Sequence, residues 1–123
     1  MPKVLVIDDE HMIRWSIEQT VRSAGYEVAT AETAAEGLAL FRQLRPAVVF
    51  LDVRLPDASG LVVLKQIKDE SAPQTAVIVM TAFEEDCSAA DAVRLGACGY
   101  LKKPFDFDEL QTIVGKAVEA RRA

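Results

Sequence analysis

Short apolar runs alternate with helical patterns along the chain, and a polar residue directly follows four of the five runs. The runs are too short for helices and rich in β-branched residues, so they predict buried strands. The predicted strands are 4–7, 26–30, 47–51, 76–80 and 98–101. Because a parallel crossover needs a helix to return the chain, this alternation predicts a parallel sheet with helices on both faces. We expect an α/β, flavodoxin-like doubly wound fold with five strand–helix units and strand order 2-1-3-4-5.

The segments between the strands carry apolar residues at helical spacing. Thr33 and Glu36 have the pattern of a capping box at the start of the second helix. The fourth helix is predicted over about 84–95, with acids in its first turn. Its apolar stripe is thin, so we expect it to be the least firmly packed helix. The last helix is predicted to start at Asp106, with Phe107 among the residues on its buried face.

Composition narrows the class of protein. The 123 residues suit one domain, 1–123, and half of them are hydrophobic. The formal charge of -5 argues against direct nucleic-acid binding by this domain, since that binding needs clustered positive charge. No apolar run is as long as a membrane span, and we expect a cytoplasmic protein without membrane contact. Cys87 and Cys98 lack metal-ligand spacing and are expected to be reduced thiols.

Polar residues follow the predicted strands where ligands bind in this fold. Asp8 and Asp9 follow the first strand, Asp52 the third, Thr81 the fourth and Lys103 the fifth. Parallel strands all end at one edge of the sheet, so we expect these five side chains around one crevice. One acid of this kind would most simply be solvated or cap a helix. Three carboxylates together with a lysine at one edge of the sheet favour a functional site over that simpler role.

The chemistry of that cluster indicates a magnesium-dependent reaction of phosphate. Carboxylates that lie close together repel one another, and burial raises their pKa values further. Oxygen ligands without His or Cys suit Mg²⁺, which binds through one or two carboxylates plus a phosphate. A carboxylate can also act as the nucleophile and become an aspartyl phosphate. A flavodoxin-like cofactor binder is the alternative, but it would need Ser, Thr and Gly after the first strand, where this chain has acids.

Four motifs in this order and spacing resemble the receiver domain of two-component response regulators, and the match covers essentially the whole chain. The motifs are Asp8-Asp9-Glu10, residues 51–56 with Gly60, Met80-Thr81-Ala82, and residues 100–105. The resemblance implies that Asp52 is the residue that is phosphorylated. It also implies that Asp9 and Asp52 bind Mg²⁺ directly, that Asp8 helps through water, and that the backbone carbonyl of Arg54 completes the protein ligands.

The same resemblance implies roles for the residues around the phosphoryl group. Thr81 and Lys103 would contact that group, and Tyr100 would turn inward when Thr81 moves. From the residues alone, Tyr100 could equally be a core aromatic or an exposed switch residue. The Lys103–Pro104 peptide bond is expected to be cis on the same grounds. The domain would catalyse only its own phosphorylation and dephosphorylation, and so would not be an enzyme in the usual sense.

A finer similarity is to the receivers of NtrC-type, sigma-54-dependent regulators. It is carried by Ile13-Arg14-Trp15, residues 64–68, and Gly96-Ala97 followed by Tyr100-Leu101, with a departure at Cys98-Gly99. It implies a sensor histidine kinase as partner, a homodimer on phosphorylation, and an ATPase and DNA-binding output region outside this chain. The alternatives are a stand-alone single-domain regulator and a pseudo-receiver that binds partners without taking phosphate.

Overall fold

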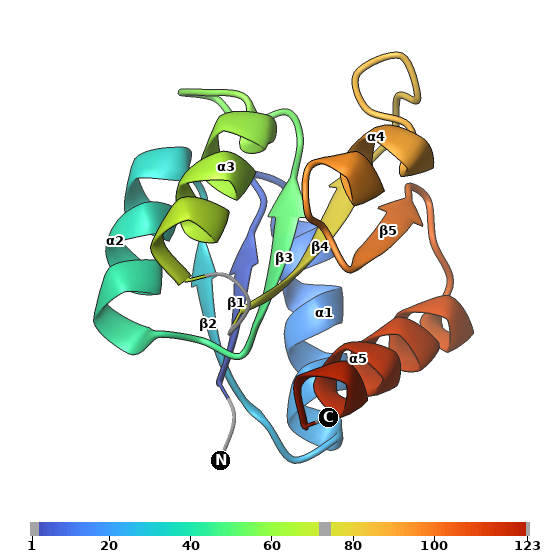
Figure 1. The fold of residues 1–123 in the computed structure, drawn as a ribbon. Coiled ribbons are helices and arrows are strands. Elements are labelled where there is room, and N and C mark those ends of the chain that lie inside the picture. The colour runs from blue at the N-terminus through green and yellow to red at the C-terminus, as the bar shows by residue number, and fades with distance from the viewer. Residues whose placement is uncertain (1–2, 72–74, 123) are drawn as a thin grey trace.

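The protein forms a three-layer α/β structure in which one twisted sheet lies between two sets of helices (Figure 1). A computed structural model describes residues 3–71 and 75–122. The strands are β1 Lys3–Ile7, β2 Glu27–Ala31, β3 Val48–Asp52, β4 Ala76–Thr81 and β5 Gly99–Lys102. The helices are α1 His11–Ser23, α2 Ala34–Leu44, α3 Gly60–Ser71, α4 Ala89–Arg94 and α5 Phe107–Arg122.

The sheet is parallel throughout, with strand order β2-β1-β3-β4-β5. This order and the five helices confirm the predicted doubly wound fold. The chain reverses its direction of travel across the sheet between β1 and β3, which are neighbours. Loops that follow these two strands therefore meet at one end of the sheet, where this fold binds ligands.

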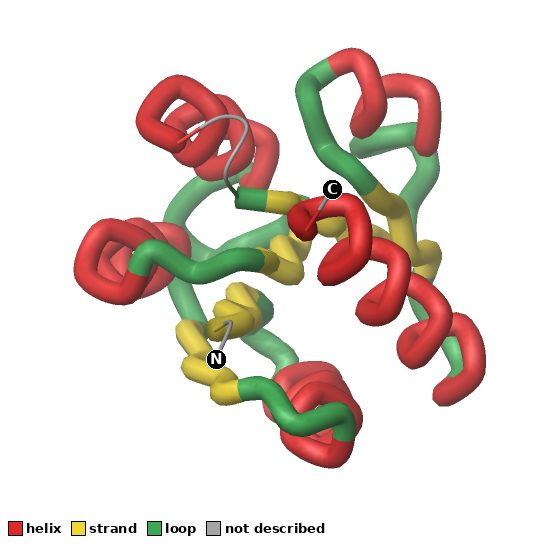
Figure 2. Tube along the Cα trace, turned by 60° about the horizontal axis from the view of Figure 1, so that its bottom comes forward, coloured by secondary structure: helices red, strands yellow, loops and turns green. Residues whose placement is uncertain are grey.

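Alternating side chains of the strands feed two separate cores. Leu5, Ile7 and Val49 face a core with α2, α3 and α4. Val6 and Phe50 face the other core, which is closed by α1 and α5. Because neighbouring residues of a strand point to opposite faces, a strand buried on both faces is a continuous apolar run, as the sequence pattern predicted. Figure 2 shows the strands at the centre with helices around them.

Helix α4 differs from its prediction. It begins at Ala89, five residues after the predicted start at Glu84. Ser88 caps it: the Ser88 hydroxyl accepts from the Asp91 N–H, and the Asp91 carboxylate accepts from the Ser88 N–H, which is a complete capping box. The acids at 84–86, which looked like a first helical turn, lie instead in the loop between β4 and α4. This short helix has one buried residue, Ala92, which agrees with the thin apolar stripe.

Three smaller expectations are also corrected. Phe107 is 58% exposed and does not belong to the buried face of α5. Strand β5 begins at Gly99, one residue later than predicted. Thr33 caps α2 by accepting from the Glu36 N–H, but the Glu36 carboxylate accepts from the Glu32 N–H, one residue before the position a capping box requires.

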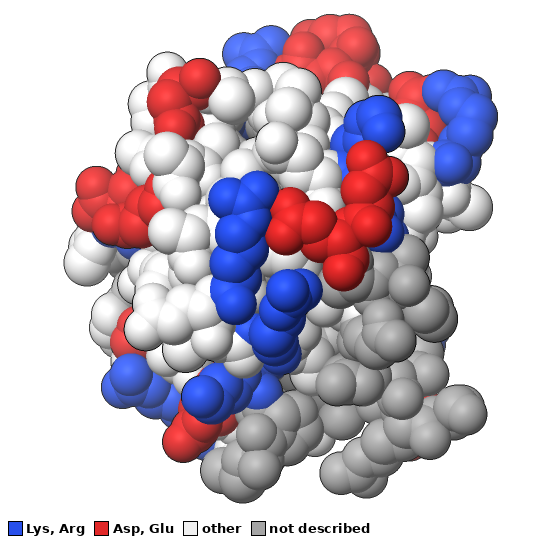
Figure 3. Space-filling model, turned by 60° about the vertical axis from the view of Figure 1, so that its left-hand side comes forward, with Lys and Arg blue, Asp and Glu red and all other residues white. Residues whose placement is uncertain are grey.

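Charged side chains of both signs share the outer surface. Figure 3 shows Lys and Arg beside Asp and Glu on one face of the molecule. Arg42 on α2, for example, pairs with Glu70 on α3 at 2.9 Å. Among the described residues, no helix has the length and apolar character needed to cross a membrane.

Candidate functional site

Four of the predicted site residues lie together at the carboxyl end of the sheet. Asp8 follows β1, Asp52 ends β3, Thr81 ends β4 and Lys103 follows β5. All four are buried, with exposed fractions of 0%, 5%, 1% and 9% respectively. Asp9, by contrast, is exposed. The fold thus places the residues where the parallel topology predicted.

The Lys103 ammonium lies at the centre of this group. Its Nζ atom is 2.8 Å from Asp8 Oδ2 and 3.4 Å from Asp52 Oδ1. It also donates to Glu10 Oε1 at 3.0 Å. Glu10 was quoted in the acidic motif but was not expected to contact Lys103. The signal available in the sequence was its place as the third of three successive acids directly after β1.

The buried carboxylates carry more negative charge than one ammonium offsets. Burial, and then the charge of Asp8, raise the pKa of Asp52 to about 6. Burial also raises the pKa of Asp8, although Lys103 opposes the shift. Burial by itself would lower the pKa of Lys103, but its contacts with Asp8, Asp52 and Glu10 raise it instead. A further positive charge at this site would relieve the excess.

The donor set fits a hard divalent cation. Asp8, Asp9 and Glu10 can each present a carboxylate oxygen within 4.8 Å of the other two. Asp52 lies beside them, since Lys103 joins it to Asp8. All these donors are oxygen atoms, which suits Mg²⁺ or Ca²⁺ rather than zinc.

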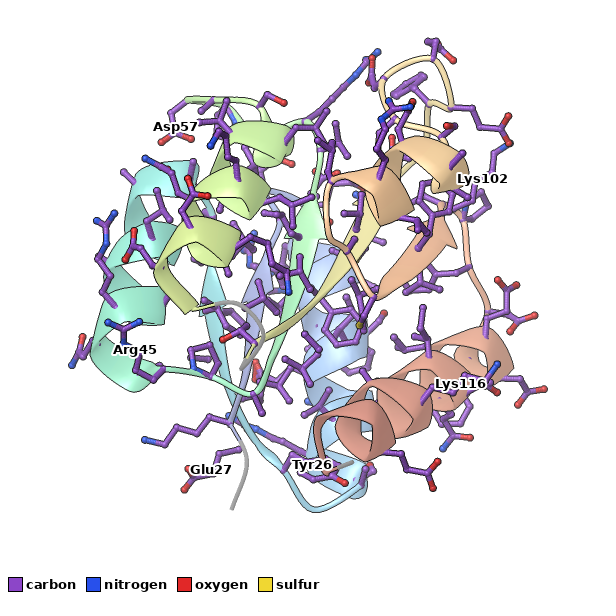
Figure 4. All side chains as sticks on the ribbon, viewed as in Figure 1. Tyr26, Glu27, Arg45, Asp57, Lys102 and Lys116 are labelled. Carbon is purple, nitrogen blue, oxygen red and sulfur yellow. The ribbon has the colours of Figure 1, made fainter. Side chains whose placement is uncertain are left out.

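The loop after β3 is held tightly against Asp52. A Cβ atom at Gly60 would lie 2.0 Å from the backbone oxygen of Asp52, so no larger residue fits there without movement. Within the same loop, before Gly60, the Asp57 carboxylate accepts from the N–H groups of Ala34 and Ala35 at 2.8 and 3.0 Å. These bonds cap the start of α2 from another segment of the chain. Figure 4 shows Asp57 at the end of the molecule opposite Tyr26.

Thr81 and Tyr100 both connect the site with the loop before α4. The Thr81 hydroxyl accepts from the Phe83 N–H at 3.0 Å and donates to the Phe83 carbonyl at 3.2 Å. The Tyr100 hydroxyl donates to the Cys87 carbonyl at 2.8 Å, and its ring is partly buried against the α2–α3–α4 core. Tyr100 is therefore in part a core aromatic. The Lys103–Pro104 peptide bond is cis.

This arrangement brings a buried carboxylate, a lysine, a hydroxyl and a set of acidic oxygens to one place. Asp52 is the last residue of β3, which is buried along its whole length. A nucleophilic oxygen, a cation site and a phosphate-binding ammonium are the parts needed for phosphoryl transfer.

Comparison with known proteins identifies the family. Residues 4–115 match the family model described as the response regulator receiver domain. The DNA-binding transcriptional regulator NtrC of Escherichia coli K12 is 41% identical over 115 residues, which are 94% of this chain and 24% of that protein. The chain thus spans about a quarter of the length of this relative.

Solved structures agree with the family assignment. The signal receiver domain of a putative LuxO repressor protein from Vibrio parahaemolyticus aligns with a TM-score of 0.90 at 30% identity, covering 98% of this chain and 92% of that one. The response regulator TrrA from Thermotoga maritima, solved in complex with Mg²⁺-BeF, aligns with a TM-score of 0.82 at 34% identity, covering 95% and 99%. This chain belongs to the receiver domains of two-component response regulators.

Proposed function

We propose that Asp52 accepts a phosphoryl group in a magnesium-dependent reaction and that this modification switches the domain. The position of Asp52 supports this proposal most strongly. Its carboxylate is buried at the end of β3 and lies 3.4 Å from the Lys103 ammonium, which also contacts Asp8. A carboxylate used only for stability would not be buried beside a second one, because each raises the cost of ionising the other.

Asp9, Asp52 and the backbone carbonyl of Arg54 would hold Mg²⁺ directly, and Asp8 would hold it through water. The raised pKa values of Asp8 and Asp52 support this assignment, because burial, and after it the charge of neighbouring carboxylates, disfavours the ionised forms that a bound cation would stabilise. When bound, Mg²⁺ would neutralise charge on the carboxylates and on the oxygens of the incoming phosphoryl group.

The ionised Asp52 would attack phosphorus in line. One bond forms between an Asp52 carboxylate oxygen and phosphorus, while the bond from phosphorus to a nitrogen of the donor's phosphohistidine breaks. The electron pair of that bond stays on the imidazole, which takes up a proton from solvent. Lys103 would exchange part of its contact with Asp8 and Glu10 for the phosphoryl oxygens, and so balance the charge as it moves.

The phosphoryl group would then bias an equilibrium between two arrangements of the domain. To reach a phosphoryl oxygen, the Thr81 hydroxyl must leave the backbone of Phe83. The Tyr100 hydroxyl donates to the Cys87 carbonyl in the same loop. A shift of this loop would therefore reach α4, which follows it. Helix α4 has few buried contacts, which makes it the element that moves most easily.

We further infer the partners from the family. A sensor histidine kinase would supply the phosphoryl group. An output region with ATPase and DNA-binding activity, as in NtrC-type regulators, would lie outside this chain. The face formed by α4, β5 and α5 would support a homodimer after phosphorylation. Val93 on α4 and Leu95, which directly follows this helix, are exposed apolar side chains that such an interface would cover.

The test is incubation with Mg²⁺ and acetyl phosphate followed by intact mass measurement. We expect the mass of one phosphoryl group to be added, and the addition to be lost with a metal chelator or in Asp52→Asn. Asp57→Asn is the matched control, because it removes an exposed carboxylate from the same loop and should leave the gain intact. A pseudo-receiver would gain no mass, and an addition that survives in Asp52→Asn would move the site elsewhere.

A further inference from the structure

The Arg54 side chain joins two loops at the mouth of the site. Its Nε and Nη2 atoms donate to the two carboxylate oxygens of Asp86, with Nη2 3.3 Å from Oδ1. Its guanidinium carbon lies 3.7 Å from the centroid of the Phe83 ring. The planar guanidinium therefore pairs with a carboxylate while it stacks on an aromatic ring, a combination that lysine could not provide. We call Arg54, Phe83 and Asp86 the clasp.

The clasp is placed next to the residues proposed to react. Arg54 comes two residues after Asp52, in the loop after β3, and Phe83 comes two residues after Thr81, in the loop after β4. The clasp thus ties together the two loops that would have to adjust around a phosphoryl group.

Phe83 also holds the Thr81 hydroxyl through its backbone. The hydroxyl accepts from the Phe83 N–H and donates to the Phe83 carbonyl, so its donor is already used. Contact between this hydroxyl and a phosphoryl oxygen requires the turn at Phe83 to open. The Arg54 side chain stacks on the Phe83 ring and pairs with Asp86. Both contacts would have to change if the turn at Phe83 opened, so they oppose its opening.

We propose that Arg54, Phe83 and Asp86 are positioning residues that hold Thr81 in its unphosphorylated arrangement, and that the clasp must open when Asp52 is phosphorylated. This inference rests on the proposed function of Asp52 and adds to it a contact that sets how readily the domain switches. An isolated exposed ion pair contributes little, but two hydrogen bonds and ring stacking on one guanidinium act together. Loss of the clasp therefore favours the switched arrangement.

A simpler role for Arg54 would be to attract an anionic phosphodonor by its charge. The two accounts predict different signs. If charge alone matters, Arg54→Ala weakens the reaction and Asp86→Ala strengthens it, because the two changes alter the net charge in opposite directions. If the clasp matters, both variants favour the switched arrangement. The double variant then equals either single variant, since one broken contact cannot be broken twice.

The experiment measures beryllofluoride binding in the presence of Mg²⁺ by titration calorimetry, for the parent and for Arg54→Ala, Asp86→Ala and the double variant. Beryllofluoride is the probe because it mimics a phosphoryl group without hydrolysis. We expect each variant to bind about threefold to tenfold more tightly than the parent, with no further gain in the double variant. The Arg42→Ala and Glu70→Ala variants remove a similar pair between α2 and α3 and should leave the affinity unchanged.

A second measurement keeps this inference separate from the phosphoacceptor assignment. Amide exchange of Phe83 in the protein without ligand should become faster in Arg54→Ala and in Asp86→Ala, whether or not the parent binds beryllofluoride. Failure of the parent to bind would overturn the proposed function alone. Unchanged Phe83 exchange, opposite effects of the two single variants on affinity, or weaker binding in both would overturn the clasp.

Discussion

Helices α2 and α4 pack on the same face of the sheet, on either side of the loop that follows Asp52. Helix α2 buries the whole Phe41 side chain and is capped from outside by Asp57. Helix α4 is about half as long, buries only Ala92 and leaves Val93 69% exposed. Elements with few buried contacts open at the lowest free energy. We therefore expect a change at Asp52 to move α4 while α2 stays fixed.

The largest expected effect on stability comes from Phe41, the buried side chain through which α2 packs on the core. Phe41→Ala should lower the free energy of unfolding by about 3–5 kcal/mol, because it deletes a fully buried ring and leaves a cavity. Val93→Ala on α4 should change it by less than about 0.5 kcal/mol, because that side chain is exposed. Urea denaturation of both variants gives the two numbers. Similar losses in the two helices would remove the basis of the comparison.

The second test concerns the carboxylate that lies between the two helices. The pKa of Asp52 is about 6 in the fold against 3.8 for a free carboxyl group, so the folded state binds the proton more tightly. Without Mg²⁺, the free energy of unfolding should therefore fall as the pH rises through this window. At pH 7, Asp52→Asn should be more stable than the parent by roughly 2–3 kcal/mol.

This difference should vanish once the pH is well below 3.8, because the parent carboxyl group is then protonated in both the folded and the unfolded state. Urea denaturation at several pH values measures it. A difference that does not change with pH would indicate a packing effect rather than a buried charge. Helix content at both pH values serves as the control for folding.

The third test asks how closely α2 lies against the sheet. A Cβ atom at Gly37 would come within 2.5 Å of the Ile7 Cδ1 atom. Gly37→Ala should therefore cost about 1–3 kcal/mol through overpacking. Gly115 in α5 is the matched control, since a Cβ atom there meets nothing within 4 Å. Gly115→Ala should stabilise the domain by about 0.5–1 kcal/mol, as alanine does in an open helix position. Equal effects at both glycines would contradict the close approach.

The smallest test compares the two helix caps. Ser88 caps α4 and Thr33 caps α2, each through a side-chain oxygen. Ser88→Ala should cost about 1 kcal/mol and speed amide exchange in α4 about fivefold, with little effect elsewhere. Thr33→Ala should lower protection in α2 and in the strands together, because α2 opens only with the whole domain. Exchange in α4 that follows the global stability would show that α4 is not an independent unit.

The sequence was sufficient for the sheet and for most of the buried site. The short length and β-branched residues of apolar runs such as 47–51 indicate buried strands, and a parallel sheet then brings Asp8, Asp52, Thr81 and Lys103 to one edge. These inferences depend on local pattern and topology, and the structure agrees with both.

The loop before α4 could not be predicted in this way. Acids at 84–86 have the pattern of a first helical turn, but long-range contacts hold them outside the helix. Lys102 pairs with Glu84 at 2.7 Å, Arg54 binds Asp86, and Tyr100 holds Cys87. The contact of Glu10 with Lys103 was also missed, because Asp8 directly follows β1 whereas Glu10 lies three residues beyond the end of this strand, where the sheet topology does not decide the direction of a side chain.

The most direct measurement is amide exchange followed by mass spectrometry, with and without acetyl phosphate and Mg²⁺, on the parent and on Asp52→Asn. We expect one added phosphoryl group on the peptide that contains Asp52, together with altered exchange over 82–102 and unaltered exchange over 34–44. Asp52→Asn should show neither change. An unmodified parent, a modified Asp52→Asn variant, or a response confined to α2 would contradict the account.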